Sequence, residues 1–204
     1  MKRSLLALAF FLLVLGSACG GVDTSSQAEA TTGKAACPAA WRTGWQKVAN
    51  RINATVYCPS WMPSPLDANI GGRWSTGVSV GKDRSYLAGF VYFEKGSEVH
   101  VNLRGYPGRT SVPKCRNDEQ AGSKRVKTFI PCFADAKKPR TVAGYRVTLY
   151  TVNRDADQWH LLYAWRRNGS LYTLSEHVAP PFGYQRVLQN LDRMMRSLVP
   201  IQPR

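Results

Sequence analysis

The fold of this chain is decided by residues 159–178, which read WHLLYAWRRNGSLYTLSEHV. Asn168-Gly169 stands between two runs of apolar and aromatic residues, and this dipeptide is the strongest short signal for a β-hairpin. Apolar side chains occur at both odd and even positions of the first run, including Leu161 and Leu162. A strand that is apolar on both faces is buried on both. The sequence therefore predicts that residues 159–166 form a central strand of a sheet and that residues 171–178 return beside it.

Further strands are predicted on the N-terminal side of this hairpin, at 74–80, 86–93, 98–104 and 144–152. Residues 98–104 alternate most cleanly, with Val99, Val101 and Leu103 on one face. Residues 94–97 are a plausible turn between two of these strands. A shorter strand at 56–59 precedes several prolines, which suit an edge because proline lacks the N–H of a ladder.

Two amphipathic helices are predicted to flank the strands, at 39–52 and 184–198. The first carries Trp41, Trp45, Val48 and Ile52 on one face. Such a stripe favours a core position over a ligand platform. The second carries an apolar stripe that should dock on the sheet; its members are Val187, Leu188, Leu191, Met194, Met195 and Leu198.

These elements predict an α+β fold: an antiparallel sheet of about six to seven strands with an N-terminal helix and a C-terminal amphipathic helix packed on it. The strands, the Asn-Gly hairpin and the final helix with Met194-Met195-Arg196-Ser197-Leu198 resemble the C-terminal part of PsbP-like α+β lipoprotein domains. The resemblance covers about the last 60 residues. It implies the fold and no particular chemistry, because that family includes non-enzymatic assembly and binding factors.

The most basic part of the chain is 104–140, which holds ten Lys and Arg against three acidic residues. We expect a turn-rich loop here around one short strand, 126–130. Its cations are candidates for contact with an anionic surface: Arg109, Lys114, Arg116, Lys124, Arg125, Lys127, Lys137, Lys138 and Arg140. The alternative is a solvated insertion with no partner.

Five cysteines are present, Cys19, Cys37, Cys58, Cys115 and Cys132. If Cys19 is modified, four remain, and an even number in an exported chain indicates two disulfides. Three pairings are allowed. We favour nearest neighbours, Cys37–Cys58 and Cys115–Cys132, because each would close a local loop.

The N-terminus has the pattern of a secretory leader. Lys2 and Arg3 precede 11 apolar residues at 5–15, too few for a membrane span of about 20. The following Leu15-Gly16-Ser17-Ala18-Cys19 resembles the lipobox of bacterial lipoproteins, with Gly16 at the position where leucine is commonest. The resemblance implies cleavage before Cys19 and lipidation of its thiol. Ordinary signal-peptidase cleavage of the same bond is the alternative.

The predicted organisation is therefore a signal peptide at 1–18, a lipidated N-terminus and flexible tether at 19–36, and a single α+β domain at 37–204. The implied location is the extracytoplasmic side of a cell membrane, through the lipid. The net charge of +15 at pH 7 indicates an anionic partner, for which the neighbouring candidates are acidic phospholipid and wall polymer. A basic chain often binds nucleic acid, but a secretory leader argues against it. We expect a monomer.

Motifs for catalysis are weak. His100, His160 and His177 have no metal-ligand spacing and are interpreted as surface or hydrogen-bonded residues. Ser111 and Lys114 match Ser-x-x-Lys, but Pro113 lies inside the motif, which we attribute to chance. We predict no catalytic, cofactor or metal site.

The sequence thus predicts an exported, membrane-anchored lipoprotein that is a non-catalytic binding or envelope-assembly module with a basic surface. The first alternative is a small hydrophobic-ligand binding protein, with Trp61, Trp74, Trp159 and Trp165 lining a concave sheet. A hydrolase is the more distant alternative.

Overall fold

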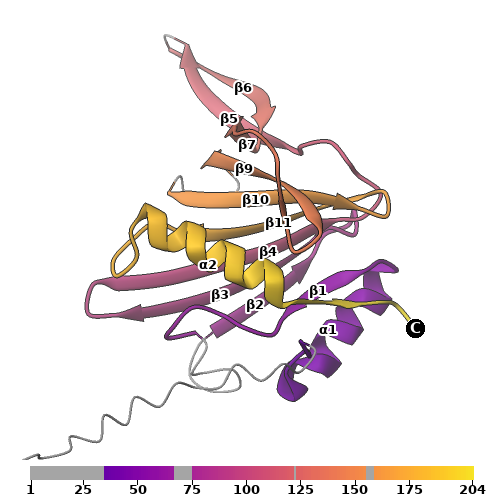
Figure 1. The fold of residues 1–204 in the computed structure, drawn as a ribbon. Helices are drawn as coiled ribbons and strands as arrows, with labels where there is room; N and C mark the ends of the chain where they lie inside the picture. The colour runs from indigo at the N-terminus through magenta and orange to yellow at the C-terminus, as the bar shows by residue number, and fades with distance from the viewer. Residues whose placement is uncertain (1–34, 67–74, 122, 155–158) are drawn as a thin grey trace, which may run out of the picture. The chain divides into compact units, whose positions relative to one another are not determined.

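Eight antiparallel strands form the main sheet of the protein in a computed structural model, which describes residues 35–66, 75–121, 123–154 and 159–204. The strands, in spatial order, are β2 (Ser75–Val80), β3 (Tyr86–Glu94), β4 (Ser97–Tyr106), β11 (Ser170–His177), β10 (His160–Arg167), β9 (Tyr145–Asn153) and β7 (Phe133–Ala136); β8 (Arg140–Val142) also pairs with β9 (Figure 1). The α+β fold expected from the sequence is confirmed, with a sheet wider than expected.

The hairpin of β10 and β11 lies at the centre of this sheet, as predicted. Its strands join through Asn168 and Gly169, whose φ angles of 48° and 69° are both positive. Positive φ at both central residues is the requirement of a type I′ turn. β10 lies between β11 and β9, and its residues from His160 to Trp165 are all buried. Both apolar faces of this strand are therefore covered.

Both helices cover the same face of the sheet (Figure 1). Helix α1 (Ala39–Ile52) begins and ends at the predicted residues, and helix α2 (Tyr184–Ser197) is one residue shorter than predicted. Val187, Leu191 and Met194 of α2 are fully buried in the core between helix and sheet. The predicted docking stripe is thus the surface that packs.

A two-stranded ribbon of β1 (Val56–Pro59) and β12 (Leu198–Ile201) completes the helical layer. β12 is not anticipated by the sequence, which ends the helix at Pro200. Pro200 instead pairs with Tyr57 in the ribbon. A proline is tolerated there because β12 has a neighbour on one side only.

The expected turn-rich loop at 105–140 is wrong, because most of this region is strand. It contains β5 (Lys114–Ala121), β6 (Lys124–Pro131), β7 and β8. β5 and β6 pair only with each other, as a separate two-stranded sheet. Their polar, charged sequence hides the alternation that marks a half-buried strand.

Two disulfides have the predicted nearest-neighbour pairing. Cys37–Cys58 joins the segment before α1 to β1, with a Cα–Cα distance of 5.6 Å. Cys115–Cys132 closes the base of the β5–β6 hairpin, with a Cα–Cα distance of 4.8 Å.

The signal peptide, Cys19, the tether up to residue 34 and Trp74 lie outside the described residues. The described part belongs to one compact unit that begins at Lys34. Among the helices of that described part, none has the length and apolar character that crossing a bilayer requires.

Candidate functional site

The β5–β6 hairpin carries most of the cations predicted to form a binding surface. It stands beyond the β7 edge of the main sheet, away from both helices (Figure 1). Its base is fixed by the Cys115–Cys132 disulfide and by a hydrogen bond from the Cys132 amide to the Pro113 carbonyl, 2.9 Å. The hairpin is therefore a stapled projection with its strand faces open.

Strand alternation sorts the hairpin's residues into two unlike faces. One face, called here the cationic face, is exposed. The pairing of Asp118 with Lys127 and of Arg116 with Phe129 aligns its members, which are Lys114, Arg116, Asp118, Arg125, Lys127 and Phe129. The opposite face is half-buried and includes Asn117 and Thr128, where the Thr128 hydroxyl donates to the Asn117 carbonyl at 3.2 Å.

Most of the charge on the cationic face is not neutralised. Arg116 donates two hydrogen bonds of 2.7 Å to the Asp118 carboxylate, an arrangement that raises the pKa of the guanidinium. Lys114, Arg125 and Lys127 have no carboxylate within ion-pair distance among the described residues. Four cations thus face one carboxylate, and the face keeps a positive excess for a partner.

The side chain of Phe129 lies within this charge. It is 64% exposed and is directly opposite Arg116 in the neighbouring strand. Exposed large apolar side chains are unremarkable when scattered singly. Here the exposed ring is on the same face as the cations, so a partner meeting the charge also meets the ring.

The other five predicted cations lie elsewhere. Arg109 is 3.6 Å from Asp83, and Lys137 is 2.8 Å from Asp135. Arg140 pairs with Asp192 of α2 at 2.5 Å and lies over the Tyr163 ring, so it fastens β8 to the helical layer. Lys124 and Lys138 are exposed but outside the cationic face. The structure therefore gathers Lys114, Arg116, Arg125 and Lys127, and separates the rest.

All three histidines meet on the sheet face opposite the helices. The register places His100 of β4, His177 of β11 and His160 of β10 in one row across three adjacent strands. The rings of His160 and His177 stack with centroids 5.2 Å apart, and His100 meets His160 edge-on at 4.8 Å. The interpretation of the histidines as unrelated surface or hydrogen-bonded residues missed this cluster, because only the register brings them together.

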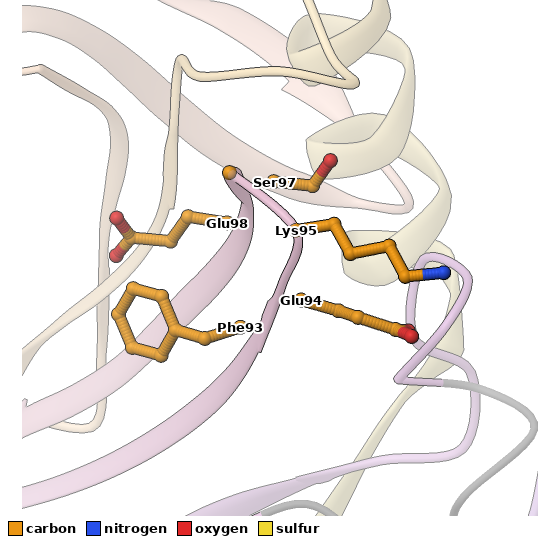
Figure 2. A pocket seen from close by; sticks show the side chains of 6 residues that line it. Phe93, Glu94, Lys95, Ser97 and Glu98 are labelled. Atoms are coloured by element: carbon orange, nitrogen blue, oxygen red, sulfur yellow. The ribbon is translucent and has the colours of Figure 1, made fainter.

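Glu98 connects the histidine row to solvent. Its carboxylate oxygens lie 3.4 Å from Nδ1 of His100 and 3.4 Å from Nδ1 of His177. Figure 2 shows Glu98 and Phe93 on one side of the β3–β4 turn, where a pocket of about 350 Å³ opens. His160 has no exposed surface, so the pocket reaches the carboxylate and not the whole row.

No metal site emerges from this cluster: within the described ranges, no three His, Cys, Asp or Glu side chains are arranged to hold an ion. The row is a buried polar cluster, in which His160 Nδ1 lies 3.2 Å from the Ser175 hydroxyl and His100 Nε2 lies 3.1 Å from the Asn102 amide oxygen.

The four tryptophans suggested as a ligand surface do not gather. Trp165 is buried in the core at 1% exposure, and Trp61 lies beneath the Arg193 guanidinium, 4.2 Å from its ring centroid. Trp159 is 71% exposed, while Trp74 is outside the described residues.

A different pair of tryptophans lines an apolar cavity of about 170 Å³ between α1 and the β2–β3 side of the sheet. Trp41 and Trp45 form one wall, and Val78 and Phe90 form the other. Trp41 packs against Phe90 with ring centroids 5.2 Å apart. The helix stripe interpreted as core is therefore core that also borders a cavity.

Comparisons with known proteins add nothing to this geometry, since no family model, no curated protein and no solved structure matches the chain.

Proposed function

We propose that this protein is an exported lipoprotein, anchored through Cys19, whose domain is a non-catalytic binding module for an anionic component of the cell envelope. The cationic face of the β5–β6 hairpin is the observation that carries the proposal. Lys114, Arg125 and Lys127 there are exposed, share one face and have no described carboxylate partner. An anionic surface would supply the missing countercharge.

The anchor is tested first, on the protein as exported by a bacterial host. The mature N-terminus should be a Cys19 carrying acyl chains, detected by mass spectrometry, and the protein should partition with the membrane fraction. Cys19→Ser should release it. An unmodified Cys19 in the mature protein would refute the anchor and leave ordinary signal-peptidase cleavage.

The binding role is tested on residues 19–204 with Cys19→Ser, a chain that contains the whole compact unit from Lys34. Two anionic probes are used, vesicles containing phosphatidylglycerol and soluble inorganic polyphosphate. Binding to at least one of them should weaken as ionic strength rises, because salt screens exposed charges. The double variant Arg125→Gln with Lys127→Gln should bind roughly 25-fold more weakly, at about fivefold for each cation lost near a charged surface.

The matched control is Lys47→Gln with Arg51→Gln, which removes the same charge from the exposed side of α1. It should bind as the unsubstituted chain does. Equal loss in the two double variants would mean that net charge alone drives binding. Salt-independent binding, or binding to neither probe, would remove the proposed role.

A second candidate function, binding of a small hydrophobic ligand, is favoured by the cavity beside Trp41 and Trp45. A ligand that binds only the folded protein raises its melting temperature. Thermal shifts with short-chain fatty acids test this candidate, with Val78→Arg as the variant that should fill the cavity mouth. Shifts that persist unchanged in this variant, or no shift at all, would eliminate it.

A further inference from the structure

Phe129 gives the cationic face a property that charge alone does not. A purely electrostatic partner, such as a soluble polyanion, offers nothing apolar to an exposed aromatic ring. The ring is 64% exposed, next to Lys127 on its own strand face and opposite Arg116. Cations around an aromatic or aliphatic side chain are the composition of segments that lie at the interface of an anionic bilayer.

We propose that the cationic face docks on a bilayer of anionic phospholipid, with the Phe129 ring inserted among the headgroups and with Lys114, Arg125 and Lys127 against the lipid phosphates. This inference rests on the proposed function and names the partner of the same surface. Charge complementarity and the exposed ring favour lipid over a wall polymer, because lipid alone provides both a phosphate layer and an apolar layer beneath it.

The geometry of the hairpin suits such docking. The half-buried face, with Asn117 and Thr128 bonded to each other, is turned away from the cationic face. The Cys115–Cys132 disulfide ties the hairpin's base to the domain. The contact would therefore orient the whole domain on the surface, in addition to the lipid that the proposal attaches to Cys19.

The test separates lipid insertion from electrostatic attraction with one substitution, Phe129→Ala, in residues 19–204 with Cys19→Ser. Its binding to phosphatidylglycerol vesicles should fall roughly tenfold, as expected for loss of a partly buried aromatic ring. Its binding to polyphosphate should stay unchanged. The control is Phe93→Ala, which removes another exposed phenylalanine, 69% exposed, from β3 of the main sheet. This variant should bind vesicles normally.

Depth of insertion provides the second measurement. A tryptophan introduced by Phe129→Trp should add fluorescence that brominated phosphatidylglycerol quenches, measured against the chain without this substitution. Vesicles of phosphatidylcholine alone should not bind. Vesicle binding that is unaffected by Phe129→Ala, with a residue 129 fluorophore that is not quenched, would overturn the insertion. Polyphosphate binding without vesicle binding would overturn the lipid partner and leave the proposed function standing, whereas binding to neither would end both.

Discussion

Two hairpins of this protein have the same strand length and opposite environments. Each strand of β5–β6 and of β10–β11 has eight residues. The first seven residues of β11 are buried, whereas five of the eight residues of β6 are exposed and the other three half-buried. The central hairpin gains stability from burial on both faces. The outer hairpin gains little from burial and depends on a disulfide at its base, and its side chains are available to a partner.

The comparison indicates where folding and binding are divided in this molecule. Substitutions in β10–β11 should alter stability, and substitutions on the cationic face should alter binding. Each prediction below tests one side of that division, in order of decreasing expected effect.

Trp165→Ala should have the largest effect on stability. The indole is 1% exposed and contacts the rings of Tyr57 and Tyr172 at centroid distances of 5.4 and 5.6 Å. Removing a buried aromatic ring costs about 3–5 kcal/mol in the free energy of unfolding. Urea unfolding measures the loss. Phe129→Ala is the paired variant on β6 and should stay within about 0.5 kcal/mol. Similar losses in both variants would contradict the division.

Glu176 should make the central hairpin's stability depend on pH. Burial between β11 and α2 raises the pKa of its carboxyl from 4.5 to about 8, although Asn190 donates a hydrogen bond of 2.7 Å to it. The folded state thus holds the proton more tightly than the unfolded chain. The stabilisation is complete below pH 4.5 and is lost as the pH rises to about 8, at about 1.4 kcal/mol per pH unit.

Glu176→Gln tests this prediction because the amide imitates the protonated acid and still accepts from Asn190. The free energy of unfolding of the variant, measured in urea at several pH values, should decline less between pH 5 and 8. Glu119→Gln, on the exposed β5 strand, should keep the original slope. An unchanged slope in Glu176→Gln would place the pH dependence elsewhere.

Removing the Cys115–Cys132 disulfide should loosen the outer hairpin alone. The bond closes a loop with a sequence separation of 17, for which the chain-entropy model gives about 3 kcal/mol. In Cys115→Ala with Cys132→Ala, amide protection of β5 and β6 against hydrogen exchange should fall about 100-fold, since an isolated hairpin is marginal in water. Amides of β10 and β11 should keep their protection. Equal loss in both hairpins would show that the two are coupled.

The central hairpin could be predicted from the sequence because its signals are local. Asn168-Gly169 specifies the turn, and the apolar character of both faces of 159–166 specifies a central strand. The helices were predictable for the same reason, since a 3.6-residue stripe such as Val187–Leu191–Met194 needs no knowledge of the partner surface. Cysteine count and loop length sufficed for the disulfides.

The outer hairpin and the histidine row could not be predicted fully, because each depends on pairing between distant residues. In β5 both faces are polar, so no hydrophobic alternation marks it as a strand. Without β5, the register that places Arg116 opposite Phe129 is unknown. Likewise His100 and His177 share a row only through the pairing of β4 with β11. The sequence predicted a cationic region; its division into one coherent face and scattered ion pairs is a property of the register.

The smallest expected effect on stability belongs to the cationic face itself. Arg125→Gln with Lys127→Gln should change the free energy of unfolding by no more than about 0.5 kcal/mol, because exposed charges contribute little to folding. Neither cation has a carboxylate within ion-pair distance among the described residues. Urea unfolding at low and high salt measures the change, and the same preparation serves the vesicle assay. If this variant lost more than 1.5 kcal/mol, weaker vesicle binding would reflect an unfolded hairpin. If stability is kept while binding falls about 25-fold, the charge serves a partner and not the fold.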